Sequence, residues 1–262
     1  MIIFSGLLLS LFLEYVSPGA FVPLIAATKI GTIVPLVTLI FVLFKVRPVS
    51  NGDVLKEINT KWIAFYLFLL AVSVLAADVT LYSWTIFKFV LGYVFWYIMI
   101  VKLVTDLSRL KMVIVVLVAS HVLLLALNPA VITHPETRSY LRAAPFLGDG
   151  NDFSLSVCVI LPMCIWLALA SGSKVKQVIL VLFLAALLLA IIGTQSRGAS
   201  LALGGAMGFL WWRGKRKFAG VVLIAVVAAI VVSFAPPQYF ERMQTIANYQ
   251  QEGSAMGRIT AW

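Results

Sequence analysis

The residue type with the clearest chemical potential in this sequence is arginine, and one arginine lies at a tight turn between two apolar stretches. Arg197 is part of IIGTQSRGASLALGG, residues 191–205. Its planar guanidinium group suits bidentate binding of phosphate or carboxylate. We expect a helix from Gly198 with Thr194 or Ser196 as its N-cap, and the N–H groups of its first turn also attract anions. The turn predicts an anion-binding position, and the alternative is an arginine that extends to lipid headgroups.

Glycines lie on both sides of this turn. Gly193 is expected to cap the helix that precedes the turn, because glycine adopts the left-handed conformation that often ends a helix. Three further glycines, Gly204, Gly205 and Gly208, follow within the next apolar stretch. Small residues let helix backbones approach each other in a membrane, so these glycines predict close packing of the second helix against its neighbours.

The histidines and cysteines offer weaker chemistry. His121 is within an apolar run and is expected to hydrogen-bond a neighbouring helix. His134, in THPET, is expected at the surface, and the alternative is a general base. Cys158 and Cys164 match no zinc or redox spacing and are expected to be small buried residues. We predict no metal and no cofactor.

The carboxylates in predicted loops and helix ends have two interpretations. Asp149 and Asp152 lie within GDGND, residues 148–152. This stretch is typical of a turn that leads into the N-cap of a helix. The alternative is contact with a sugar or another acceptor group. Glu14, near the end of the first apolar run, has the same two interpretations.

The composition shows what must position these residues. Of 262 residues, 62% are hydrophobic and 11% are charged, whereas a soluble domain is about half apolar and a quarter charged. Successive long apolar runs predict an all-α, polytopic transmembrane helix bundle in one membrane domain, residues 1–262. The first run is short, so whether it spans the membrane stays open. We predict about nine helices, at 2–16, 28–44, 62–77, 84–104, 112–127, 153–170, 176–193, 198–212 and 218–235.

The connecting segments alternate in charge. Thirteen of the 20 Lys and Arg residues fall in segments 45–61, 102–111, 171–176 and 213–217. The positive-inside rule makes these segments cytoplasmic, which places the N-terminus inside and segment 128–152 and the tail from 236 outside. The net charge of +10 therefore requires no nucleic-acid partner. We expect a multi-pass membrane protein with its N-terminus in the cytoplasm.

The other seven cations are not needed for orientation. Five of them are arginine, whereas nine of the 13 cytoplasmic cations are lysine. Arginine is the better residue for bidentate anion recognition, so an anionic ligand on the outer face would explain this bias. The seven are Lys29, Lys88, Arg138, Arg142, Arg197, Arg242 and Arg258.

The ordered set of outer motifs resembles the O-antigen ligase / O-antigen polymerase superfamily, bacterial membrane glycosyltransferases that use lipid-linked glycans. TQSRG is similar to the family's hinge between two spans. The loop with Arg142 that runs into GDGNDFSLSVCVILP is similar to its loop and helix entry, and GSAMGRITAW is similar to its Gly-Arg and Trp stretch. The resemblance covers residues 130–262. The earlier spans agree only in hydropathy.

The resemblance implies transfer of a glycan from undecaprenyl diphosphate to a lipid or protein acceptor on the periplasmic face. It also implies that Arg142, Arg197 and Arg258 bind the diphosphate, with Arg138 and Arg242 as second candidates. The family's catalytic histidine has no counterpart here, so no catalytic residue is assigned. The chain is expected to be a C-terminally truncated member, and whether it is active is left open.

Alternative functions within this resemblance are an O-antigen polymerase or a protein O-glycosylation ligase. An alternative of another class is a transporter or flippase for an anionic substrate, which would place polar residues near the membrane midplane. The spans contain few charges and the arginines gather toward one face, which favours chemistry at the outer interface. A non-catalytic membrane scaffold is the third hypothesis.

Overall fold

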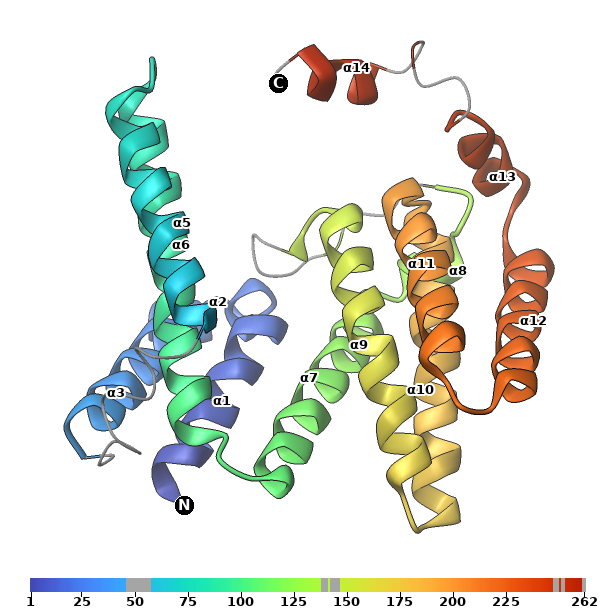
Figure 1. Ribbon diagram of the computed structural model, residues 1–262, viewed down its shortest axis with the longest axis horizontal. Helices are drawn as coiled ribbons and strands as arrows, with labels where there is room; N and C mark the ends of the chain where they lie inside the picture. Colours follow the sequence, from blue (N-terminus) through green and yellow to red (C-terminus); the bar gives the residue numbers. More distant parts are fainter. Residues whose placement is uncertain (46–57, 138–140, 142–146, 247–249, 251–252, 261–262) are drawn as a thin grey trace. The chain divides into compact units, whose positions relative to one another are not determined.

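The structure is a computed structural model of the chain. It describes residues 1–262 except 46–57, 138–140, 142–146, 247–249, 251–252 and 261–262. All the secondary structure in the described part of the chain is helical, which confirms the all-α prediction. Figure 1 shows the helices in chain order.

The nine predicted helices are all present. They are α1 (Ile2–Val16), α3 (Ile30–Lys45), α5 (Ile58–Leu75), α6 (Thr80–Leu103), α7 (Leu107–Leu127), α9 (Gly150–Ala170), α10 (Lys174–Thr194), α11 (Arg197–Arg213) and α12 (Lys217–Phe234). Short helices occupy segments that the sequence predicts as loops. They are η1 (Pro18–Ala20), α2 (Pro23–Ala27), α8 (Ala130–Thr133), α13 (Pro237–Gln244) and α14 (Gly253–Thr260).

Six of the described helical segments are long and apolar enough to cross a membrane. They are Ile2–Ala20, Thr80–Leu103, Leu107–Leu127, Gly150–Ala170, Lys174–Thr194 and Lys217–Phe234. The first apolar run therefore qualifies as a span by length and composition once the turn of η1 is included. The protein is a multi-pass membrane protein.

The chain divides into two compact units. Unit 1 comprises Met1–Leu11 and Thr28–Val113, and unit 2 comprises Phe12–Ala27 and Ile114–Trp262. The candidate site lies in unit 2. A single membrane domain over residues 1–262 stays a prediction.

In unit 1, α6 lies beside α5 and contacts α3. The hydroxyls of Thr60 and Tyr97 lie 2.7 Å apart and join α5 to α6. A Cβ atom built on Gly6 would lie 2.6 Å from Thr38 Oγ1, so α1 and α3 approach closely at this glycine.

In unit 2, α9 packs against α10 and α11, and these three helices lie side by side in Figure 1. Fully buried side chains such as Phe153 of α9 and Leu187 of α10 form the core between them. His121 Nε2 lies 2.8 Å from Ser156 Oγ, which joins α7 to α9 and confirms the predicted helix-to-helix hydrogen bond. Both cysteines are free and buried, as predicted.

The glycines of α11 do not have the packing role that the sequence predicts. A Cβ atom built on Gly204, Gly205 or Gly208 meets nothing within 4 Å. The reason is the direction of the helix face, because α11 turns Ala199, Leu203 and other larger side chains into the core and turns the glycines away.

The close approach is instead at Gly193 of α10. A Cβ atom there would overlap the backbone carbonyl oxygen of Val131, in α8. Gly193 is therefore the residue that lets α8 pack directly on α10.

Candidate anion-binding site at the hinge

The hinge, residues 194–197, joins α10 to α11. Gln195 ends α10 in the left-handed conformation, with φ 51° and ψ 32°. The predicted glycine cap is therefore wrong, because Gly193 is still inside the helix. Ser196 is the N-cap of α11, and its hydroxyl accepts from the N–H of Ala199 at 3.3 Å. Helix α11 thus begins at Arg197, one residue before the predicted start.

Polar contacts from distant segments hold the hinge in place. The hydroxyl of Thr194 bonds the hydroxyl of Ser154, in the first turns of α9. The amide Nε2 of Gln195 donates to the Pro135 carbonyl at 2.7 Å, although the two residues are 60 apart in sequence. A non-glycine residue with positive φ is uncommon, and this bond helps to offset the strain. The hinge is a buried, hydrogen-bonded turn.

Arg197 extends from the first turn of α11 toward α13. Its Nη1 donates to Thr245 Oγ1 at 2.7 Å, and the Thr245 hydroxyl donates to the backbone carbonyl of Arg242 at 2.8 Å. Arg197 is half-buried. It therefore lies between the hinge and the end of α13, next to the N–H groups that open α11.

A second contact holds α13 on α11. The hydroxyls of Ser200 and Tyr239 lie 2.8 Å apart, and the Tyr239 side chain is only 6% exposed. Arg197 and Ser200 are three residues apart, so they occupy the same face of α11. This face carries the segment that follows α12, and it places α13 over the start of α11.

This arrangement can bind an anion. The first turn of an α-helix has N–H groups without intrahelical partners and the positive end of the helix dipole. Arg197 adds a permanent positive charge at the same point. A phosphate-sized group at the hinge would meet both the guanidinium fork and the helix end.

Of the other predicted arginines, the structure describes the surroundings of Arg242 only. Arg242 is half-buried in α13, and Thr245 connects its backbone carbonyl to Arg197. Arg138 and Arg142 lie outside the described residues. Arg258 is within α14, but its side chain lies outside the described part. A common site of Arg142, Arg197 and Arg258 therefore stays a prediction.

The structure also describes the other candidate residues, which are the carboxylates and His134. Asp149 is the N-cap of α9, as the GDGND pattern predicts, and accepts from the N–H of Asn151 at 2.9 Å. Asp152 is exposed in the first turn of α9. His134 is exposed, with Nδ1 2.8 Å from Thr133 Oγ1. Glu14 is half-buried in α1. Within the described residues, no His, Cys, Asp and Glu side chains gather as a metal site would require.

Sequence reasoning missed the residues that fix α13 to α11. Tyr239 and Thr245 are in the tail, which shows no long apolar run. The signal that was present is PQYFERMQ, in which proline at the first helical position begins a short amphipathic helix. The contacts of this helix are tertiary and do not follow from the pattern.

The contacts between α11 and α13 lead to a prediction about local opening. In the double variant Tyr239→Phe, Thr245→Val, the amides of residues 237–246 should exchange with solvent roughly 30-fold faster, since two lost hydrogen bonds at about 1 kcal/mol each weaken the local structure by about 2 kcal/mol. Hydrogen exchange with mass spectrometry measures this. Thr85→Val is a matched control, because its hydroxyl bonds only within its own helix. Unchanged exchange at 237–246 would show that these contacts do not hold α13.

The fold and this site define a polytopic, all-α membrane protein with an arginine at a buried hinge between two helices. A protein-family profile described as O-Antigen ligase matches residues 180–262. The match confirms the resemblance to the O-antigen ligase / O-antigen polymerase superfamily over the region that holds the hinge and α11 to α14. Residues 130–179, with Arg138 and Arg142, precede the matched region. Neither a search of curated proteins nor a search of solved structures found a match.

Proposed function

We propose that this protein is a membrane glycosyltransferase of the O-antigen ligase type, which moves a glycan from undecaprenyl diphosphate to an acceptor on the periplasmic face of the bacterial inner membrane. The observation that supports this most is the position of Arg197. It is inside the family-matched region, half-buried at the start of α11, and hydrogen-bonded to the segment that follows α12.

The chemistry of the transfer explains why such an arginine is useful. When the anomeric C–O bond breaks, the diphosphate leaving group gains negative charge. Donors that are already oriented toward that charge lower the barrier. In this proposal the guanidinium of Arg197 and the first N–H groups of α11 bind the diphosphate. The bond from Arg197 Nη1 to the Thr245 hydroxyl fixes the direction of the guanidinium group.

The other arginines take supporting roles in the proposal. Arg142 and Arg258 bind the same diphosphate, and Arg138 and Arg242 are second candidates. The acceptor is a lipid, as in a ligase, or a growing glycan or a protein hydroxyl. The base that activates the acceptor hydroxyl is unassigned. The test of the function is glycan transfer by variants of Arg197, which opens the Discussion.

The proposed orientation puts the N-terminus in the cytoplasm and the hinge outside. Its support in unit 2 is that three segments predicted on the same side meet there. Segment 128–152 reaches the hinge through Pro135, and the tail reaches it through Thr245. Contacts of this kind agree with the alternation of charge along the chain.

Cysteine labelling tests the absolute orientation. With a membrane-impermeant maleimide added to intact spheroplasts, Gln238→Cys should react, and Lys215→Cys should react only after permeabilisation. Both positions are exposed, and the native thiols are buried. Labelling at position 215 in intact spheroplasts would show that the orientation is the reverse of the proposed one, with the hinge on the cytoplasmic side.

A further inference from the structure

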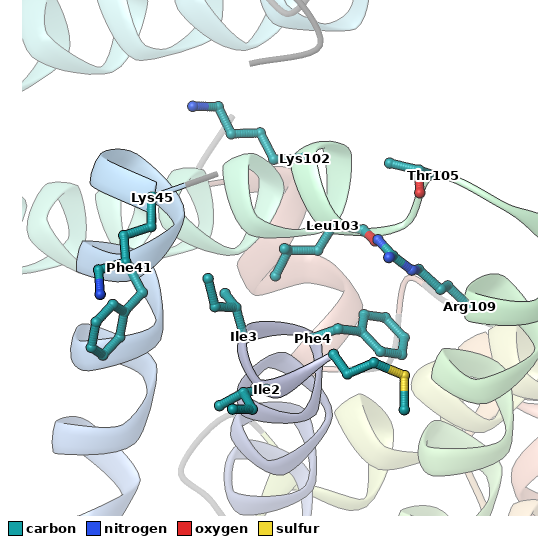
Figure 2. Close-up of a pocket in the computed structure, with 10 residues that line it drawn as sticks. Ile2, Ile3, Phe4, Phe41, Lys45, Lys102, Leu103, Thr105 and Arg109 are labelled. Carbon is teal, nitrogen blue, oxygen red and sulfur yellow. The ribbon is translucent and has the colours of Figure 1, made fainter. Parts of the chain in front are cut away.

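A cavity in unit 1 has no role in the proposed transfer. It has a volume of about 760 Å³ and lies where the start of α1 meets the ends of α3 and α6 and the turn into α7. Figure 2 shows its lining. This volume is within the range of small-molecule and cofactor sites, roughly 300–1,000 Å³. The helix ends that form it all belong to segments that the charge pattern places on the cytoplasmic side.

The floor of the cavity is apolar. It is lined by side chains from three helices: Ile3 and Phe4 of α1, Phe41 of α3 and Leu103 of α6. Phe4 and Leu103 are buried, whereas Phe41 is 40% exposed. A hydrocarbon chain is the kind of group that such a floor can cover without leaving polar atoms unsatisfied.

The edge of the cavity is cationic, and its cations differ in how they are already engaged. Arg109 lies 3.3 Å from a carboxylate oxygen of Asp106 and donates to the Leu103 carbonyl at 2.8 Å, so it closes the turn between α6 and α7. The Nζ atom of Lys45 lies over the ring of Phe41, 5.3 Å from its centre. Neither Lys45 nor Lys102 forms an ion pair with a carboxylate of the described residues. These two lysines give the cavity edge a net positive charge.

We propose that this cavity binds one anionic phospholipid, with its phosphate between Lys45 and Lys102 and an acyl chain on the floor formed by Ile3, Phe4 and Phe41. A basic pocket between membrane helices is a known way to bind anionic lipid headgroups. A neutral lipid would leave the two lysines without a counter-charge. A soluble anion would leave the apolar floor in contact with water. Only a molecule with both an anionic headgroup and a hydrocarbon chain matches the two lysines and the apolar floor.

The test is a lipid titration of the full chain, purified in a neutral detergent, with the thermal unfolding midpoint as the readout. Phosphatidylglycerol should raise the midpoint in a saturable manner, because a ligand that binds the folded state stabilises it. Phosphatidylcholine and glycerol 3-phosphate should give no saturable increase. The double variant Lys45→Gln, Lys102→Gln should weaken the apparent affinity for phosphatidylglycerol by roughly 25-fold, since each lysine contributes about fivefold near an anionic lipid.

Two further variants separate the cavity from general surface charge. Lys174→Gln, Lys176→Gln changes the net charge equally, at the start of α10 in unit 2, and should leave the affinity unchanged. Ile3→Trp fills the floor and keeps every charge, and should also weaken binding. Equal responses to phosphatidylglycerol and phosphatidylcholine would overturn the proposal. So would an equal loss in the control pair, or a glycerol 3-phosphate response as large as that of the lipid.

Discussion

Replacing Arg197 with alanine should reduce glycan transfer from undecaprenyl diphosphate by about a hundredfold. A hydrogen bond to a charged group contributes roughly 1.5–3 kcal/mol, and about 1.4 kcal/mol corresponds to a tenfold change in rate. Arg197→Lys keeps the charge and loses the planar fork, so it should reduce transfer by about tenfold. The measurement is turnover of the protein, expressed from its own gene and purified, at matched protein levels.

Controls separate binding of the diphosphate from support of the fold. Arg213→Ala removes a cation from the other end of α11 and should leave turnover unchanged. Thr245→Val removes a neutral hydrogen-bond partner of Arg197 and should lower turnover by less than about tenfold. Wild-type turnover in Arg197→Ala would show that the arginine only anchors the helix at the membrane interface and does not bind the diphosphate. Loss of Arg197→Ala and Arg197→Lys from the membrane would instead make its role structural.

Gly193→Ala should be the most destabilising small substitution in unit 2. The added methyl group would occupy the position of the Val131 carbonyl oxygen, and α8 would have to move away from α10. Overpacking of this kind costs about 1–3 kcal/mol of unfolding free energy. The thermal unfolding midpoint in detergent should fall clearly below that of the wild type.

Gly204→Ala is the matched control for this substitution. Gly204 is also inside a helix, but an added Cβ atom there meets nothing within 4 Å. Alanine is the better helix former by roughly 1 kcal/mol, so the midpoint should stay the same or rise. If Gly193→Ala and Gly204→Ala unfolded at the same temperature, the contact between α8 and α10 would not exist as described.

The long helices were predictable because each one is a long apolar run. Hydropathy alone places α9, α10 and α12 within a few residues of their observed ends. The short helices α8 and α13 were not placed by hydropathy. Helix α8 has only four residues, and the amphipathic pattern of PQYFERMQ in α13 is too short to form a stable helix without tertiary contacts. Their contacts, such as the one between Val131 and Gly193, join segments far apart in the chain.

The hinge shows the same limit at the level of single residues. The sequence pattern identified Arg197 and offered Ser196 as one of two N-caps, because capping follows local rules. It assigned the helix end to Gly193, since glycine adopts positive φ most easily. The structure places Gln195 there, with a hydrogen bond to Pro135. A partner 60 residues away leaves no mark in a local pattern. The same holds for Thr245, the partner of Arg197.

The central claim is that Arg197 binds the diphosphate, and inhibition of transfer by undecaprenyl diphosphate tests it most directly. Undecaprenyl diphosphate without a glycan should inhibit transfer by the wild-type protein in competition with the donor, and the diphosphate-free alcohol undecaprenol should not. In Arg197→Lys, which retains enough turnover to measure, the inhibition constant of undecaprenyl diphosphate should rise by about tenfold or more. An unchanged inhibition constant in this variant, or equal inhibition by undecaprenol, would contradict the assignment of Arg197 to the diphosphate.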